Sequence, residues 1–84
     1  METITAQIVN RGFAGEPEHI CLQALESLKI FEFSQIKHLV ENEAITSLSL
    51  NDNDMTSEPI QRILNTGHKV QISFNENDEV TLHF

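Results

Sequence analysis

The sequence predicts an α+β fold, a two-layer sandwich in which helices cover one face of a four-stranded mixed sheet. Four segments alternate apolar and polar residues with the period of a half-buried strand. Three other segments place apolar residues at helical spacing. The chain has 84 residues, which is enough for a single domain over residues 1–84 with one modest core.

The first half of the chain predicts a strand followed by two helices. Residues 3–9 alternate as a strand does, and a turn with two glycines follows at residues 10–15. Residues 16–28 then carry Pro17, which is tolerated in a first helical turn, and apolar residues at i, i+3, i+4 and i+7. A second, shorter helix is predicted at residues 34–43.

The second half predicts one helix and three strands. Residues 46–50 alternate as a strand, and a helix is expected between a cap at Thr56 or Ser57 and a terminating glycine, Gly67. Residues 70–74 and 80–84 alternate again and form a hairpin. The predicted element order is therefore β-α-α-β-α-β-β, with the first strands parallel because helices connect them and the last pair antiparallel.

The apolar faces of these elements are expected to meet in one core. Each predicted strand is apolar at every second residue and each predicted helix along one stripe, which leaves the other face of the sheet to polar side chains. The predicted core comprises Ile4, Ile8, Leu25, Leu28, Leu39, Leu48, Leu50, Ile63, Leu64, Val70, Ile72, Leu82 and Phe84.

The charge balance argues against polyanionic partners. Five basic and thirteen acidic residues give a formal net charge of −8, and the basic residues lie far apart in the sequence. Nucleic acids and anionic membrane surfaces are bound by clustered Lys and Arg, so we expect binding to neither. The acidity fits either a basic partner protein or the requirement to remain in solution.

The single cysteine, Cys21, excludes an internal disulfide and favours a reducing compartment. No apolar run approaches the ~20 residues of a membrane span, and residues 1–3 lack the basic start of a secretory signal. We therefore expect a cytoplasmic protein.

Catalysis, a cofactor and a metal ion are not predicted at any residue. The four histidines are scattered, and with one cysteine they give no zinc-ligand spacing. Cys21 lies on the apolar stripe of the predicted helix, near Glu18 and Glu26, which predicts a buried and inert thiol. The glycine turn lacks the Lys-Ser/Thr of a phosphate loop, and the acidic turn lacks the Gly and Glu of a calcium loop.

The C-terminal half resembles the SirA/TusA sulfur-carrier family. The resemblance rests on Leu48-Ser49-Leu50, the acidic turn Asn51-Asp52-Asn53-Asp54, the helix face from Ile60 to Leu64, Thr66-Gly67-His68 and the two last strands. It implies that family's fold and sulfur transfer through a Cys-Pro-x-Pro motif at the start of the first helix. This chain has Gly15-Glu16-Pro17-Glu18 there, so no residue takes over the role of the sulfur-carrying cysteine.

We expect a non-enzymatic accessory or protein-interaction domain that meets another protein through its acidic surface or its open sheet face. The expected contact residues lie in the glycine turn, the acidic turn and the polar sheet face: Arg11, Phe13, Asp52, Asp54, Gln71, Ser73 and His83. A homodimer through the open face or an edge strand is a second mode of association. The alternatives are a sulfur-relay protein that has lost or moved its cysteine and an acidic inhibitor that mimics nucleic acid.

Overall fold

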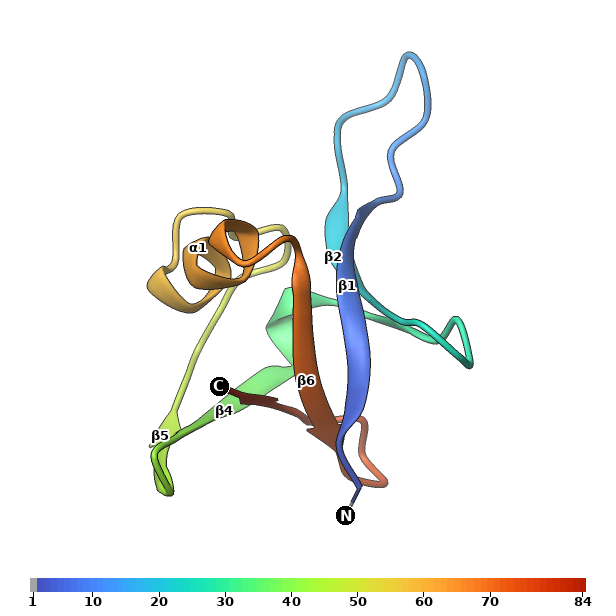
Figure 1. The fold of residues 1–84 in the computed structure, drawn as a ribbon. Helices are drawn as coiled ribbons and strands as arrows, with labels where there is room; N and C mark the ends of the chain where they lie inside the picture. The colour runs from blue at the N-terminus through green and yellow to red at the C-terminus, as the bar shows by residue number, and fades with distance from the viewer. Residues whose placement is uncertain (1) are drawn as a thin grey trace.

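One seven-stranded sheet and two short helices make up the regular structure of residues 2–84, which this computed structural model describes (Figure 1). The strands are β1 (Ile4–Asn10), β2 (Ile20–Ala24), β3 (Ile30–Phe31), β4 (Ile36–Glu41), β5 (Ala44–Ser47), β6 (Lys69–Phe74) and β7 (Val80–His83). The helices are the 3₁₀ turn η1 (Phe33–Gln35) and the α-helix α1 (Glu58–Asn65). The predicted four-stranded α+β sandwich with three helices is therefore wrong, because the fold is mostly β.

The strand order across the sheet is β3-β2-β1-β6-β7-β4-β5. All neighbouring strands pair antiparallel except β4 and β7, which run parallel. The expected parallel pairing of the first strands is wrong, because a loop rather than a crossover helix joins β1 to β2. The parallel pair instead arises where the chain returns from β5 through α1 and β6 to place β7 beside β4.

The segment predicted as the first helix, residues 16–28, forms β2 and the loops on either side of it. Leu22 faces the core beside Ile8, and Cys21 is buried on the opposite face of the sheet beside Val9. Because both faces of β2 are covered, its apolar run is continuous and fits a helical stripe as well as a strand. The hairpin pairing with β1 decides between the two.

The second predicted helix, residues 34–43, is replaced by η1 and β4. Asn42 and Glu43 both have positive φ, 51° and 68°, and lie between the paired residues Glu41 and Ala44. This is the two-residue turn that matches the twist of antiparallel strands. The predicted strand at residues 46–50 is consequently displaced, since β5 ends at Ser47.

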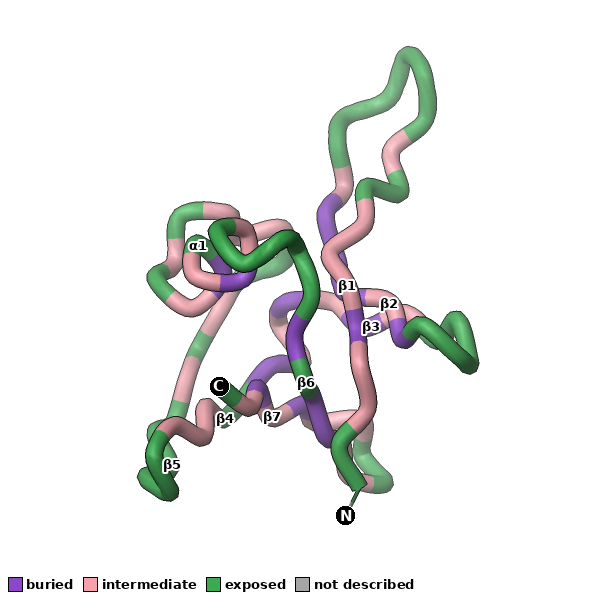
Figure 2. The backbone as a smooth tube through the Cα atoms, in the orientation of Figure 1, coloured by how far each residue is buried: buried purple, intermediate pink, exposed green. Residues whose placement is uncertain are grey.

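The core lies between the sheet and α1, with buried residues along β6 and β7 and on the inner side of the helix (Figure 2). Ten of the predicted core residues are confirmed as buried or packed against it: Ile4, Ile8, Leu39, Leu48, Leu50, Ile63, Leu64, Val70, Ile72 and Leu82. The prediction is wrong for Leu25, Leu28 and Phe84, which are 37%, 62% and 39% exposed. Leu25 and Leu28 lie in the tight turn after β2, where no second layer covers them, and Phe84 ends the chain beside α1.

Helix α1 lies where the sequence predicts a helix. Ile60 and Ile63 form its buried face against the sheet. On another side, Arg62 donates hydrogen bonds to both carboxylate oxygens of Glu41 on β4, and its guanidinium carbon is 4.3 Å from the ring centroid of Phe84. These contacts hold α1 over β4 and the end of β7.

Candidate interaction surfaces

The polar sheet face brings three of the predicted contact residues together on β6 and β7. Gln71 is exposed and donates a hydrogen bond to the hydroxyl of Thr5 on β1 at 2.7 Å. Ser73 is only 7% exposed, and its hydroxyl lies 2.7 Å from Nε2 of His83. Because Ser73 is buried and bonded within the sheet, Gln71 and the partly exposed His83 are the two of these three predicted contact residues that remain available.

The loop between β1 and β2 projects from the sheet as an arm, formed by residues 11–19, and carries two more of the predicted residues (Figure 1). Phe13 is 75% exposed, the largest exposed fraction among the exposed large apolar side chains of residues 2–84. Arg11 is exposed near the base of the arm. The amide of Glu16 bonds to the carbonyl of Phe13 at 2.9 Å, and Gly15 has a φ of 89°, so a tight turn presents the ring.

The base of the arm is fixed by hydrogen bonds from backbone amides to the Asn10 side chain and to one backbone carbonyl. The side-chain oxygen of Asn10 accepts bonds from the amides of Gly12 at 2.9 Å and His19 at 3.2 Å, and the amide of Arg11 bonds to the carbonyl of His19 at 2.7 Å. A Cβ on Gly12 would lie 2.6 Å from the carbonyl oxygen of Pro17. Glycine is therefore required at this position for the two sides of the arm to approach each other.

Asn53, in the loop before α1, ties the arm to the rest of the molecule. Its side-chain oxygen accepts a bond from the amide of Ile20 at 2.6 Å, and its side-chain nitrogen donates to the carbonyl of Glu18 at 3.4 Å. The sequence predicts residues 51–54 only as an acidic turn and assigns no role to Asn53. The available signal was weak: Asn tolerates positive φ, and Asn53 has a φ of 61°.

The two predicted acidic residues of this loop differ in environment. Asp52 is exposed, whereas Asp54 accepts bonds from the amide and hydroxyl of Thr56 at 3.1 and 3.0 Å and so shapes the turn into α1. The second acidic turn, residues 75–79, lies beyond the other end of β6 from α1 (Figure 1). The acids of the two turns therefore lie toward opposite ends of β6 (Figure 1).

Cys21 is fully buried, as the sequence predicts, but on a strand rather than a helix. Burial raises the pKa of its thiol, and the negative charge of Glu32 raises it further against a smaller opposing effect of Arg11. The same Glu32 carboxylate lies 2.6 Å from Nε2 of His19. A thiol that is buried and held protonated is a poor nucleophile.

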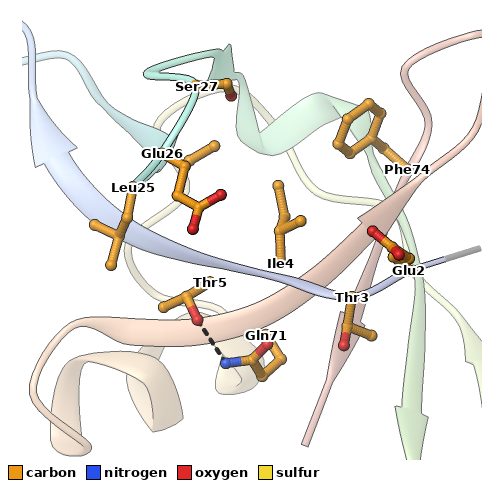
Figure 3. A pocket seen from close by; sticks show the side chains of 10 residues that line it. Glu2, Thr3, Ile4, Thr5, Leu25, Glu26, Ser27, Gln71 and Phe74 are labelled. Atoms are coloured by element: carbon orange, nitrogen blue, oxygen red, sulfur yellow. Dashed lines mark hydrogen bonds between the residues drawn. The ribbon is translucent and has the colours of Figure 1, made fainter.

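A cavity of about 560 Å³ lies beside the start of β1, where the turn after β2 approaches β6 (Figure 3). Ile4, Leu25 and Phe74 supply apolar lining, and Glu2 and Glu26 supply two carboxylates. This lining can accommodate an apolar group next to a positive charge.

Comparisons of the chain with protein-family models, with curated proteins and with solved structures gave no match. Among residues 2–84, no helix is long and apolar enough to cross a membrane. The same residues contain no group of three or more His, Cys, Asp and Glu side chains that could hold a metal ion.

Proposed function

We propose that this protein is a non-enzymatic interaction domain that binds another protein through the β1–β2 arm, with Phe13 as the anchoring side chain. The observation that carries the proposal is the exposure of Phe13, 75%, on a projecting loop whose base is fixed. Aromatic side chains that enter a partner's pocket supply much of the binding energy of protein interfaces. A fixed base lowers the conformational entropy lost on binding.

The charges around Phe13 favour a basic partner. Glu16 and Glu18 are exposed on the same arm, and Arg11 is its single Lys or Arg. The rest of the chain contributes further negative charge, to a total of −8. The partner surface that fits best is an apolar pocket rimmed by Lys or Arg, because such a rim accelerates encounter with an acidic protein and pairs with the two glutamates.

A site-specific crosslinker can identify the partner. We would place a photoreactive phenylalanine analogue at position 13, irradiate it in an extract of the native cell, and identify the adduct. A chain with the same analogue at Gln71 serves as the control for a position that is exposed but outside the arm. We expect an adduct with one protein at position 13 that the control does not give.

Affinity measurements with the purified partner then test the role of the ring. We expect Phe13→Ala to weaken binding by about 30-fold or more, as an anchoring aromatic residue does. The Glu16→Gln and Glu18→Gln double variant is expected to slow association and to reduce its salt dependence. Equal affinity of Phe13→Ala and the original chain for the crosslinked protein would contradict the proposal.

A further inference from the structure

We propose that two copies of this chain associate through strand β5, whose edges pair antiparallel to join the two sheets into one. This inference concerns a surface separate from the arm, and it does not depend on the proposed function. It rests on three properties of β5: its position at the end of the sheet, its lack of charge, and the exposure of Ile45.

Strand β5 lies at one end of the strand order and pairs only with β4 among the described strands. Its four residues, Ala44–Ser47, are all exposed. The amide of Leu48 bonds to the carbonyl of Lys37 on β4 at 2.8 Å. Because the bonding direction alternates along an antiparallel strand, Ile45 and Ser47 direct their amides and carbonyls outward, away from β4.

The edge of β5 lacks the features by which proteins usually prevent strands from pairing. Residues 44–50 contain no charged residue, no proline and no glycine, although the chain carries a net charge of −8. The opposite edge of the sheet differs, since β3 has two residues and is flanked by a charge on both sides, Lys29 and Glu32, whereas β5 has four residues and a flanking charge on one side only, Glu43. Short edges and flanking charges oppose association, so β5 is the edge open to it.

The occupant that fits this edge is a second copy, because the segment is complementary to itself. A twofold axis through an antiparallel pair places each residue opposite one that faces the same side of the sheet. With Ile45 opposite Ile45 of the second copy, two side chains that are each 71% exposed cover one another. Val40 lies beside Ile45 in the β4–β5 pairing, so the two copies form a continuous apolar row of four residues.

The charges of two copies are also compatible in this register. Glu43 of one copy falls opposite Ser47 of the other, and Asn42 falls opposite Leu48, so no acid meets an acid. His38 is paired with Ser47 and Lys37 with Leu48 on β4. The β4–β5 turn of one copy, which carries Glu43, therefore approaches the end of β4 that carries Lys37 in the other. Elsewhere the net charge opposes association, and the short edge makes a small interface, so the dimer is expected to be weak.

Sedimentation over a range of concentrations tests the association. We expect the average mass to rise from monomer toward dimer, and Ile45→Lys to remain monomeric at a tenfold higher concentration. Because Ile45 is exposed, this variant is expected to fold, which circular dichroism and its unfolding midpoint check. Phe13→Lys makes the same change on the arm and is expected to dimerise as the original chain does. A chain that stays monomeric throughout, or an Ile45→Lys variant that dimerises normally, would overturn the proposal.

Disulfide crosslinking tests the register independently of affinity. In a Cys21→Ala background, Ile45→Cys would bring two thiol-bearing residues opposite one another, with Cα atoms about 5.5 Å apart, within the range of a disulfide. Thr46→Cys, one residue later, faces the other side of the sheet and would lie opposite Ala44. We expect oxidation to give a covalent dimer from Ile45→Cys and not from Thr46→Cys. Crosslinking of the second variant alone, or of neither, would refute this register.

Hydrogen exchange gives a further measurement on the unmodified chain. The outward amides of Ile45 and Ser47 are expected to exchange more slowly at high than at low protein concentration. Protection that does not depend on concentration at both amides would contradict pairing through β5.

Discussion

The side-chain oxygen of Asn53 accepts a hydrogen bond from the amide of Ile20 at 2.6 Å, across 33 residues of sequence. Together with the bond from Asn53 to the carbonyl of Glu18, this contact makes one side-chain amide act as a strand partner for the start of β2. The loop before α1 and the arm are thereby joined.

Replacement of Asn53 is therefore expected to destabilise the fold. Asn53→Gly removes both hydrogen bonds but tolerates the positive φ, and we expect a loss of about 1–3 kcal/mol in the free energy of unfolding. Asn53→Ala adds the cost of a left-handed residue and should lose more. Urea unfolding measures both, with the exposed neighbour Asn51→Ala as control. A loss no greater than that of the control would contradict the bridging role.

Two leucines three residues apart should respond very differently to truncation. Leu22 is fully buried in the core, so Leu22→Ala is expected to cost about 2–5 kcal/mol. Leu25 is 37% exposed, and Leu25→Ala should cost about 1 kcal/mol or less. Unfolding curves of the two variants compare them directly. A larger effect at Leu25 would support the helical stripe that the structure replaces with a strand.

A glycine at position 43 is expected to stabilise the turn between β4 and β5. Glu43 has a φ of 68°, which costs an ordinary residue roughly 1–2 kcal/mol relative to its preferred conformation. Glu43→Gly creates the Asn-Gly pair that such turns favour, and we expect it to raise stability by about 1 kcal/mol. The melting temperature measures the change. Glu76→Gly, in the turn at residues 75–79, serves as the control for loss of one negative charge.

The pKa of Glu41 should depend on Arg62. Hydrogen bonds from Arg62 are the main cause that lowers the pKa of the Glu41 carboxyl. They outweigh the opposing effect of desolvation, and the positive charge of Arg62 adds a smaller lowering. The lowered pKa stabilises the folded chain above the unfolded-state pKa of about 4.3, and this contribution is lost as the pH falls through the folded value.

NMR titration of the side-chain carboxyl checks this assignment. We expect a midpoint below the ordinary value for Glu41 and a return toward that value in Arg62→Gln. Lys69→Gln removes a positive charge elsewhere and should leave the midpoint in place. An unchanged midpoint in Arg62→Gln would show that the ion pair does not form in solution.

The Cys21 thiol should be unreactive in the folded chain. Its burial and the neighbouring Glu32 raise its pKa, so the thiolate is scarce at neutral pH. We expect alkylation by iodoacetamide to be slow in buffer and fast in denaturant. Rapid labelling of the folded chain would favour the sulfur-relay alternative, which requires an accessible thiolate.

The sequence by itself determined the elements whose pattern fits one conformation. Residues 3–9 and 70–74 alternate without a competing helical period and form β1 and β6 to within one residue. Ser57, Pro59 and Gly67 mark the ends of a helix chemically. These elements formed where they were predicted. The burial of Cys21 was also predicted, since its apolar neighbours cover it in either a helix or a strand.

Only the tertiary structure decided the region from residue 16 to residue 50. The spacing of Ile20 and Leu22 fits a strand, and that of Cys21 and Leu25 fits a helix. Pairing with β1 selects the strand, because it satisfies the backbone hydrogen bonds of both β1 and β2. The same holds for β4, which is fixed by its pairing with β7. Ile36 lies opposite Val80, which is 44 residues later in the sequence, and Leu39 lies opposite Leu82. The position of β5 at the edge of the sheet follows from the strand order, and the exposure of Phe13 follows from the pairing of β1 with β2. No local pattern of residues encodes it, because it depends on contacts between segments far apart in the chain.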